Sequence, residues 1–404
     1  MAKSLIPKLP LYPFVLSAIK RVIVVAKTPD TPVKPLGEYP ANKLADALHP
    51  ACQYLKVEKI IEQTEDVKTF VFVPDTTRGT KNLAWFSAGS YLSISYSDDN
   101  IRFTRPYSLS SSPRKSKENH YCITVKRTEG GIASNYMLDN WTVGTKVVAS
   151  DPQGDFTYEP LRDAKHVIGV VGGSGITPFR SMAYAIADGD EDFDLTILYG
   201  SRTLEDAVFT DELKALSETC PKIKLINVLS EQRVKGCKYG FITAKLIESV
   251  APKGEPYSLF LCGPQAMYEF VDKEIKTLKL KPKYIRHELF GEYFNPTNDR
   301  GYKGKKDAEY TITVRISGKE QKVPCDANTS VLRALEAASI DAPNRCRSGR
   351  CGWCHSQLLS GEVYTPKRVD GRRIGDLEYG YIHPCCSFPL SDITIDVPPV
   401  PVAK

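Results

Sequence analysis

The chain has 404 residues, of which 42% are hydrophobic and 25% are charged, so it is an ordinary globular protein with room for about two to four domains and not a disordered or fibrous one. Its formal net charge of +6 is mild and its basic residues are spread along the sequence, which gives no sign of a nucleic-acid-binding surface. Eleven cysteines in a chain of this length do not indicate a disulfide scaffold, so we expect a reducing compartment, the cytoplasm.

Residues 1–50 form a proline-rich N-terminal extension that holds 8 of the 28 prolines. Two short apolar runs, near residues 12–16 and 22–25, are accompanied by prolines that disfavour regular structure. We expect an extended arm on the protein's own surface; a membrane-surface or partner-docking arm is the alternative. The run Val22–Ala26 is too short to span a bilayer, and no cleavable signal peptide is evident.

Residues 51–160 show a strand-like pattern. Short β-branched or aromatic runs, separated by Asp, Gly, Ser and Pro turns, occur at residues 54–60, 67–73, 91–96, 121–127 and 146–149. One helix is expected near residues 134–140. The pattern predicts a small antiparallel β-barrel.

The barrel segment contains the run Arg105-Pro106-Tyr107-Ser108. An aromatic ring beside a hydroxyl on a strand can stack on a planar cofactor while it hydrogen-bonds the cofactor's edge. An arginine two residues before the ring can hold a phosphate in a bidentate manner. Alone the signal is weak, because Tyr107 could equally be a core tyrosine.

A second signal follows in the same segment. Gly130 and Gly131 precede Ser134 at the start of the expected helix, where backbone N–H groups are available to a pyrophosphate. Ser134 could also be an ordinary helix cap. The two signals in this order, on a barrel, favour a bound cofactor over two unrelated structural features.

From residue 161 to 289 the rhythm changes to alternating strands and helices. Apolar strands are expected at residues 166–171, 195–199, 224–229 and 258–261, with helical stretches near residues 177–186, 205–218, 243–249 and 264–278. Alternation of this kind predicts a parallel, doubly wound α/β sheet.

Two loops of this segment carry chemistry. The first strand ends in Gly173-Ser174-Gly175-Ile176-Thr177-Pro178, and glycine-rich turns at the carboxyl ends of such strands bind nucleotides. This run is neither a G-x-G-x-x-G fingerprint nor a P-loop. A later strand ends in Cys262-Gly263-Pro264, which could set a small polarizable side chain against a second ring; a buried structural thiol is the alternative.

Residues 290–308 are predicted to be a linker, and residues 309–404 a small α+β domain. Within this domain Cys346, Cys351 and Cys354 follow the spacing C-x4-C-x2-C, and Cys385 comes much later. That spacing is the plant-type [2Fe–2S] pattern. A zinc site is less well supported because only one C-x2-C knuckle is present, and a Rieske centre would need paired Cys-x-His motifs.

With these motifs in place, residues 51–404 resemble the ferredoxin–NADP reductase superfamily. The domain order is similar to the branch with a C-terminal plant-type ferredoxin domain, such as phthalate dioxygenase reductase, ketosteroid hydroxylase reductase and hybrid-cluster-protein reductase. The resemblance implies a flavin-binding antiparallel β-barrel (51–160), an NAD(P)-binding α/β domain (161–289) and a β-grasp-like ferredoxin domain (309–404). Residues 1–50 have no counterpart in it.

The resemblance also implies roles for individual residues. Tyr107 would pack on the isoalloxazine and Ser108 would bond flavin N5. Cys262 would flank the nicotinamide, so these three would act at the reacting rings. The remaining cofactor-binding residues would be Arg105 and Pro106 in the flavin motif, Gly130, Gly131 and Ser134 at the flavin phosphate, Gly173, Gly175, Thr177, Pro178 and Gly263 around the nicotinamide, Ser201 and Arg202 at the adenosine end, and Phe290 on the flavin.

Two cofactor choices remain open in the sequence. The Gly-Gly-x-x-Ser motif favours FAD, with FMN as the alternative. Arg202 could clamp the 2′-phosphate of NADPH. However, Phe209 stands where NADPH-using members often have Tyr, and Glu205 and Asp206 add repelling charge, so we expect NADH.

These parts together predict a route from NADH through FAD and a [2Fe–2S] cluster, held by Cys346, Cys351, Cys354 and Cys385, to an external redox protein. The rival interpretation is an electron-transfer subunit of a larger complex that never meets free nicotinamide. Basic residues around the cysteine loop suggest an acceptor with an acidic docking surface: Arg345, Arg347, Arg350, Lys367, Arg368, Arg372 and Arg373. The sequence does not identify that acceptor.

Overall fold

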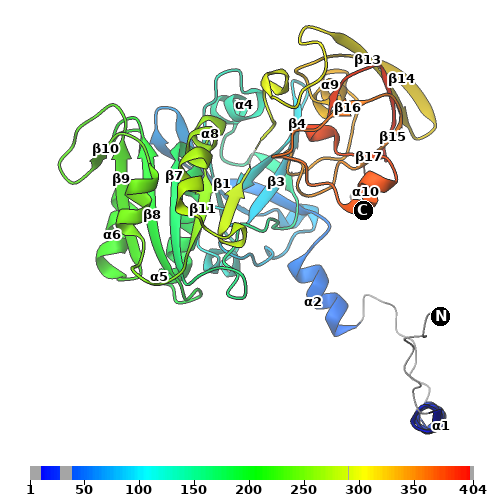
Figure 1. The fold of residues 1–404 in the computed structure, drawn as a ribbon, viewed down its shortest axis with the longest axis horizontal. Coiled ribbons are helices and arrows are strands. Elements are labelled where there is room, and N and C mark those ends of the chain that lie inside the picture. Colours follow the sequence, from blue (N-terminus) through cyan, green and yellow to red (C-terminus); the bar gives the residue numbers. More distant parts are fainter. Residues whose placement is uncertain (1–10, 28–38, 290, 401–404) are drawn as a thin grey trace, which may run out of the picture. The chain divides into compact units, whose positions relative to one another are not determined.

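The structure is a computed structural model that describes residues 11–27, 39–289 and 291–400. It divides into two units, Met1–Ala47 and Leu48–Lys404. The first unit carries α1 (Leu11–Lys27) and most of α2 (Pro40–Leu48) (Figure 1). Among the described residues, no helix combines the length and the apolar character needed to cross a membrane.

The expectation of an extended arm is therefore wrong for residues 11–27 and 40–48, which are helical. The prolines misled the prediction because two of them lie in the first turn of a helix. Pro40 is the first residue of α2, and Pro13 is the third residue of α1. At these positions the missing N–H of proline has no intrahelical partner to lose.

The first part of the second unit is an antiparallel sheet of six strands in the order β4-β3-β6-β1-β2-β5. The strands are β1 (Gln53–Thr64), β2 (Val67–Pro74), β3 (Tyr91–Ser97), β4 (Arg102–Ser108), β5 (Tyr121–Lys126) and β6 (Lys146–Ala149). A bridge between Leu109 and Ile123 joins the two edge strands and closes the predicted barrel. The short α3 (Arg114–Lys117) and α4 (Ile132–Asn140) lie between its strands in sequence, and Trp141 packs edge-on against Phe70 in its core.

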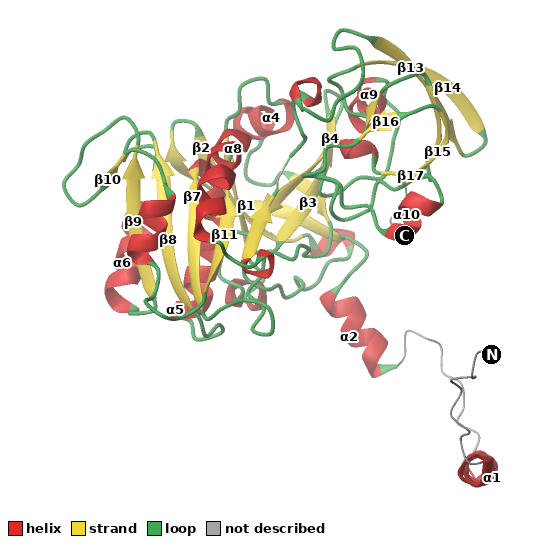
Figure 2. Ribbon diagram, viewed as in Figure 1, coloured by secondary structure: helices red, strands yellow, loops and turns green. Residues whose placement is uncertain are grey.

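The second part is a parallel sheet in the order β10-β9-β8-β7-β11-β12. Its strands are β7 (His166–Gly172), β8 (Asp194–Ser201), β9 (Ile223–Leu229), β10 (Lys238–Tyr239), β11 (Tyr257–Cys262) and β12 (Ile285–Glu288). The helices of this part are α5 (Ile176–Ala187), α6 (Thr210–Thr219), α7 (Ala244–Val250) and α8 (Gln265–Glu274), and Figure 2 shows α5, α6 and α8 with the strands β7 to β11. The order of strands along the chain reverses between β7 and β11, which is where such sheets bind ligands.

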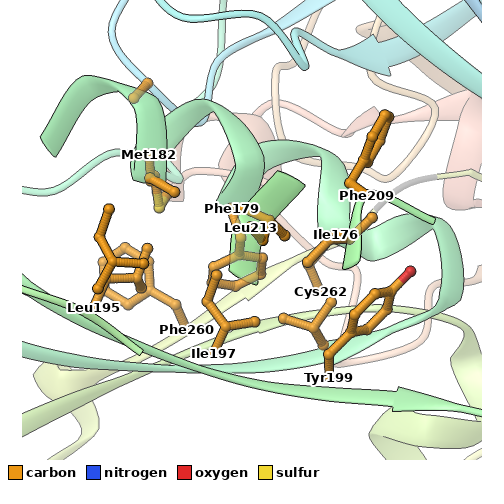
Figure 3. Close-up of a cluster of buried hydrophobic side chains, with 14 of the residues drawn as sticks. Ile176, Phe179, Met182, Leu195, Ile197, Tyr199, Phe209, Leu213, Phe260 and Cys262 are labelled. Carbon is orange, nitrogen blue, oxygen red and sulfur yellow. The ribbon is translucent and has the colours of Figure 1, made fainter. Parts of the chain in front are cut away.

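Side chains alternate between the two faces of this sheet, as expected for strands buried on both sides. Val167 and Val171 of β7 pack with α5 and α6, whereas Ile168 and Val170 pack with α7 and α8. Figure 3 shows the hydrophobic core on the α5–α6 face of the sheet, where side chains of α5 and α6 pack against those of β8 and β11. The doubly wound prediction is confirmed.

The C-terminal part has a five-stranded sheet in the order β14-β13-β19-β15-β17 and a two-stranded ribbon of β16 and β18. Its elements are β13 (Glu309–Ile316), β14 (Lys319–Asp326), α9 (Val331–Ala337), β15 (Ser356–Ser360), β16 (Val363–Tyr364), α10 (Ile374–Glu378), β17 (Tyr381–Ile382), β18 (Phe388–Pro389) and β19 (Ile393–Asp396). The predicted linker is packed against this part, because the hydroxyls of Tyr293 and Tyr364 both donate to Asp299 at 2.7 and 2.8 Å.

Candidate functional site

The four predicted cluster cysteines converge on one small volume. The sulfurs of Cys354 and Cys385 lie 3.4 Å apart, and the thiol of Cys346 lies within hydrogen-bonding reach of Cys351 and Cys385. Cys346, Cys354 and Cys385 are buried, whereas Cys351 is exposed. Among the described residues, no three His, Cys, Asp or Glu side chains are arranged around a single ion. A binuclear cluster needs only two thiolates at each iron, so this arrangement fits it.

Backbone N–H groups of the loop point at the sulfurs. The amides of Ser348 and Cys351 donate to Cys346 Sγ at 3.5 and 3.4 Å, and the amide of Gly349 donates to Cys385 Sγ at 3.3 Å. Such bonds stabilise the negative charge of thiolates that hold a cluster. Gly349 is required here: its φ is +76°, and a Cβ would meet the carbonyl oxygen of Val369 at 2.0 Å.

Cys386 also lies close to this group, because its thiol is within hydrogen-bonding reach of Cys385. The Cys386 thiol donates to the carbonyl oxygen of His383 at 3.5 Å, whereas Cys385 Sγ receives the Gly349 amide. The choice of Cys385 as the fourth ligand stays a prediction.

On the barrel, β3 and β4 pair Tyr91 with Ser108 and Leu92 with Tyr107. Ser108 is buried, and burial raises the pKa of the half-buried Tyr107, so its phenol stays neutral. Arg105 differs from the expectation of a guanidinium reserved for phosphate. Its Nη1 donates to the carbonyl oxygen of Thr104 at 2.9 Å and to Glu336 Oε1 of α9 at 3.3 Å.

The second flavin signal lies at the start of α4. Gly130 has a φ of +67°, and Gly131 is the N-cap residue, with no side chain capping the helix. The first N–H groups of α4 are therefore available to an anion. Gly131 also lies against the Ser134 side chain, because a Cβ on Gly131 would come within 2.6 Å of the Ser134 hydroxyl oxygen. Backbone N–H groups beside a hydroxyl are the chemistry that a pyrophosphate needs.

The glycine-rich turn after β7 passes close to the end of β11. Gly173 has a φ of +52°, and a Cβ on Gly175 would meet the carbonyl oxygen of Cys262 at 2.1 Å. Gly175 is thus needed for packing of the two strand ends, a role that the sequence did not reveal. The Thr177 hydroxyl donates to the carbonyl oxygen of Ser174 at 3.1 Å and fixes the turn, while Pro178 is buried in α5.

A cavity of about 530 Å³ opens at the carboxyl edge of the parallel sheet. Gly173, Ser201 and Arg202 line it, as predicted, and Arg202 pairs with Asp206 at 3.4 Å. Three apolar lining residues were not expected from the sequence: Phe241, Met267 and Phe270, with the two phenyl rings 5.7 Å apart. Met267 and Phe270 belong to α8 and Phe241 to the loop after β10, and none of them carries a local signal.

Phe209 is not part of the cavity wall. It is the residue that precedes α6 and belongs to the buried core of Figure 3, and the Arg180 guanidinium lies 4.7 Å from its ring.

Cys262 and Glu288 stand side by side at the ends of β11 and β12, where they are register partners. Both are buried, and burial raises the pKa of each well above its usual value. Tyr268, also missed, ties this corner together: its hydroxyl donates to the Glu288 carbonyl oxygen and receives the Gly263 amide at 3.1 Å.

Tyr91 of the barrel faces this corner. Burial raises its pKa, and so do the nearby Cys346 and Cys351 of the cysteine loop and Glu288 of the sheet. Groups from all three parts of the second unit therefore meet around one tyrosine. Phe290, predicted to pack on the flavin, lies outside the described residues.

Most of the basic residues predicted around the cysteine loop form ion pairs within the chain. Arg345 pairs with Asp151 at 3.0 Å, and Arg368 with Asp272 at 3.4 Å. Two further arginines pair inside the ferredoxin part and its preceding segment: Arg372 with Asp370, and Arg347 with Glu292 and Glu336. Only Arg350, Lys367 and Arg373 of the predicted set are exposed. Four of the seven predicted basic residues therefore pair with carboxylates, which the spacing of the basic residues does not reveal.

Comparison with known proteins agrees with this division. Residues 54–158 match the family described as "Oxidoreductase FAD-binding domain", residues 170–273 the "Oxidoreductase NAD-binding domain", and residues 314–390 the "2Fe-2S iron-sulfur cluster binding domain". The fold and site thus define an NAD(P)H-dependent oxidoreductase with FAD and a [2Fe–2S] cluster.

The chain is 28% identical to the glycine betaine monooxygenase reductase subunit of Chromohalobacter salexigens, over 84% of this chain and 93% of that protein. It is also 28% identical to the ferredoxin reductase component of 3-ketosteroid-9-alpha-monooxygenase from Rhodococcus rhodochrous, over 84% and 94%. The solved structure of phthalate dioxygenase reductase superposes with a TM-score of 0.60 at 26% identity, over 86% of this chain and 98% of that one. The chain belongs to the ferredoxin–NADP reductase superfamily, in the branch that carries a C-terminal [2Fe–2S] domain.

Proposed function

We propose that this protein is the reductase component of an oxygenase system, which takes electrons from NADH and passes them to an oxygenase partner. The flavin accepts two electrons from the nicotinamide and releases them singly, and the cluster carries one electron at a time. The observation that carries the proposal is that residues of all three parts lie near Tyr91 of the barrel. These residues are Glu288, the register partner of Cys262 in the parallel sheet, and Cys346 and Cys351 of the cysteine loop.

The chain's own residues bind and orient the cofactors in this proposal. Cys346, Cys351, Cys354 and Cys385 hold the cluster. Tyr107 and Ser108 position the flavin ring, while the N-terminus of α4 with Gly130, Gly131 and Ser134 binds its phosphates. For Arg105 to bind the flavin phosphate, its guanidinium must leave Glu336 or contact Glu336 and the phosphate together. Pro106 restricts the backbone of β4 between Arg105 and Tyr107. Gly173, Gly175, Thr177, Pro178 and Gly263 shape the nicotinamide loop.

Cys262 and Glu288 serve the reacting end of the nucleotide. Cys262 offers a neutral, polarizable wall, because burial keeps its thiol protonated. Burial favours the protonated form of the Glu288 carboxyl group, and in that form it can donate a hydrogen bond to a carboxamide oxygen. A neutral corner of this kind excludes water without imposing a charge on the ring.

The choice of NADH rests on the adenosine end of the cavity. Arg202 is engaged by Asp206, and Asp206 itself lines the cavity. A 2′-phosphate would have to displace this carboxylate from Arg202 and remain close to its negative charge. NADH carries no such phosphate, and its ribose hydroxyls can bond to Ser201 and Asp206.

The surface near α10 is the side of the cysteine loop where we expect the acceptor to dock. Asp376 of α10 pairs with His355 at 3.0 Å, next to Cys354, and lies 3.8 Å from His383, close to Cys385. The adjacent surface exposes Ile374, Leu377 and Tyr379. With Arg350, Lys367 and Arg373, this surface fits an acceptor whose docking face is apolar with an acidic rim. Rising salt should slow transfer to the acceptor and leave reduction of the flavin nearly unchanged.

The test separates the steps. NADH with ferricyanide reports reduction of the flavin, and NADH with cytochrome c as a one-electron acceptor reports transfer through the cluster. Cys351→Ala should abolish the visible absorbance of the cluster and transfer to cytochrome c while it retains the ferricyanide reaction. Cys237→Ala, at a cysteine outside the loop, is the matched control and should retain both. A wild-type protein that does not oxidise free NADH would instead support the relay subunit of a larger complex.

A cytoplasmic location is part of the proposal. All eleven cysteines are free thiols in the structure, which suits a reducing compartment.

A further inference from the structure

Helix α1 carries an apolar face. Every side chain described in it, from residue 15 to residue 27, is exposed. The exposed large hydrophobic residues are Val15, Leu16, Ile19, Val22, Ile23, Val24 and Val25. Soluble proteins rarely leave so many apolar side chains in water on one element, so the face calls for an occupant.

The spacing of these residues is that of an amphipathic helix. Val15, Ile19, Val22, Ile23 and Ala26 recur at i, i+4, i+7, i+8 and i+11, which places them along one side. Leu16 and Val25 border this side and widen it. The opposite side carries the polar residues Ser17, Lys20, Arg21 and Lys27, together with the exposed Val24.

The charge of the helix identifies the kind of occupant. The sequence of α1 contains Lys20, Arg21 and Lys27 and not one Asp or Glu. A broad apolar face bordered only by basic side chains matches an anionic lipid surface, in which the acyl boundary lies beneath negatively charged headgroups. The long side chains of Lys and Arg can reach these headgroups while their methylene stems stay with the apolar face. At 17 residues, α1 is shorter than the approximately 20 residues that span a bilayer, so the helix would lie in the plane of the surface.

We propose that α1 binds the chain to an anionic lipid surface as an in-plane amphipathic helix. This proposal does not depend on the proposed function, because α1 lies in a unit separate from the cofactor-binding residues. Its consequence is that electron delivery takes place at a membrane surface, where the local concentration of any acceptor that is also membrane-bound is raised.

The experiment uses the full-length holoprotein and flotation with vesicles of phosphatidylcholine alone, or of phosphatidylcholine mixed with phosphatidylglycerol. We expect the protein to float with the mixed vesicles and much less with the neutral ones. Ile19→Asp with Val22→Asp should abolish flotation, because both charges enter the apolar face. Lys20→Glu with Arg21→Glu should weaken binding to the mixed vesicles at least about tenfold and leave the apolar face intact.

Leu44→Asp is the matched control, because Leu44 is an exposed apolar residue of the neighbouring α2 and should not affect flotation. Oxidation of NADH by ferricyanide, measured on every variant, should stay unchanged and shows that the cofactor-binding unit is intact. Three results would overturn the proposal: no flotation, equal flotation on both kinds of vesicle, or flotation unaffected by the Ile19/Val22 change. A fourth is an oligomer in light scattering that this same change dissolves, since a second copy would then cover the face.

Discussion

Arg347 provides the sharpest energetic test of the structure. Its side chain is fully buried beside Cys346, and it donates to both carboxylate oxygens of Glu336 and to Glu292. Glu336 belongs to α9 of the ferredoxin part, and Glu292 to the segment that precedes it. Among the described residues, Arg347 is the only cation that pairs with both carboxylates. Arg105 also pairs with Glu336 and Arg333 with Glu292, and both of these arginines are partly exposed.

The perturbation is Arg347→Met, which keeps much of the volume and removes the charge. Glu292 and Glu336, of which 11% and 28% is exposed, would then remain partly buried beside one another without their main partner. Breaking a buried ion pair from one side costs about 3–5 kcal/mol, so we expect a loss of this size. For a part of this size, that corresponds to a midpoint of thermal unfolding lower by at least about 12 °C.

The assay is thermal unfolding of the holoprotein followed by the visible absorbance of the cluster, because a chain of several domains does not unfold in one step. Arg315→Ala is the control: its pair with Glu320, at 3.1 Å, is about half exposed and should contribute no more than about 1 kcal/mol. A triple variant that also changes Glu292 and Glu336 to Gln should recover much of the loss. If Arg347→Met has the same midpoint of thermal unfolding as the Arg315→Ala control, this reasoning is refuted.

The other predictions concern single sites. Cys385→Ser should lose or strongly perturb the cluster absorbance while Cys386→Ser retains it; the reverse result would contradict the ligand assignment. Arg202→Ala should barely change kcat/KM for NADH, and Asp206→Asn should improve the use of NADPH; a wild-type enzyme that prefers NADPH more than about tenfold would overturn the choice of NADH. The Thr77 hydroxyl, together with Lys146, lowers the pKa of the buried Asp75 below its unfolded value of about 3.9. Its stabilising effect is therefore full above that value and lost as the pH falls through the folded pKa. Asp75→Asn should accordingly lower the unfolding midpoint at neutral pH, by a difference that shrinks below about pH 4; a constant difference down to pH 2 would refute the linkage.

Features that depend on local spacing were predictable from the sequence. The C-x4-C-x2-C run can only be a loop that gathers sulfurs, and Gly349 confirms why a glycine stands inside it. The alternation of apolar strands with helices fixed the doubly wound sheet, because both of its faces must be covered. These signals require no knowledge of distant parts of the chain.

Features that arise from tertiary contact could not be predicted. Tyr268, Phe241 and Phe270 look like ordinary core or surface aromatics until α8 and the loop after β10 meet at the edge of the sheet. Arg347 was taken for a surface charge because it lies among basic neighbours, yet its φ of +56° marks a left-handed turn, and its side chain is buried among carboxylates. The carboxylates that neutralise it are 11 and 55 residues away in sequence.

Several ion pairs join the ferredoxin part to the rest of the second unit. Arg345–Asp151 and Arg105–Glu336 join the ferredoxin part to the barrel, and both pairs are largely shielded from solvent. Arg368 joins the same part to the parallel sheet through Asp272, and its guanidinium lies 4.6 Å from the Tyr268 ring. Shielded pairs are screened by salt much less than exposed ones. The Cys346–Cys351 side of the cysteine loop is thus held toward Tyr91 by contacts that resist ionic strength. If an acceptor docks near α10, as proposed above, we expect the ferredoxin part to stay attached to the barrel and the parallel sheet while it delivers electrons.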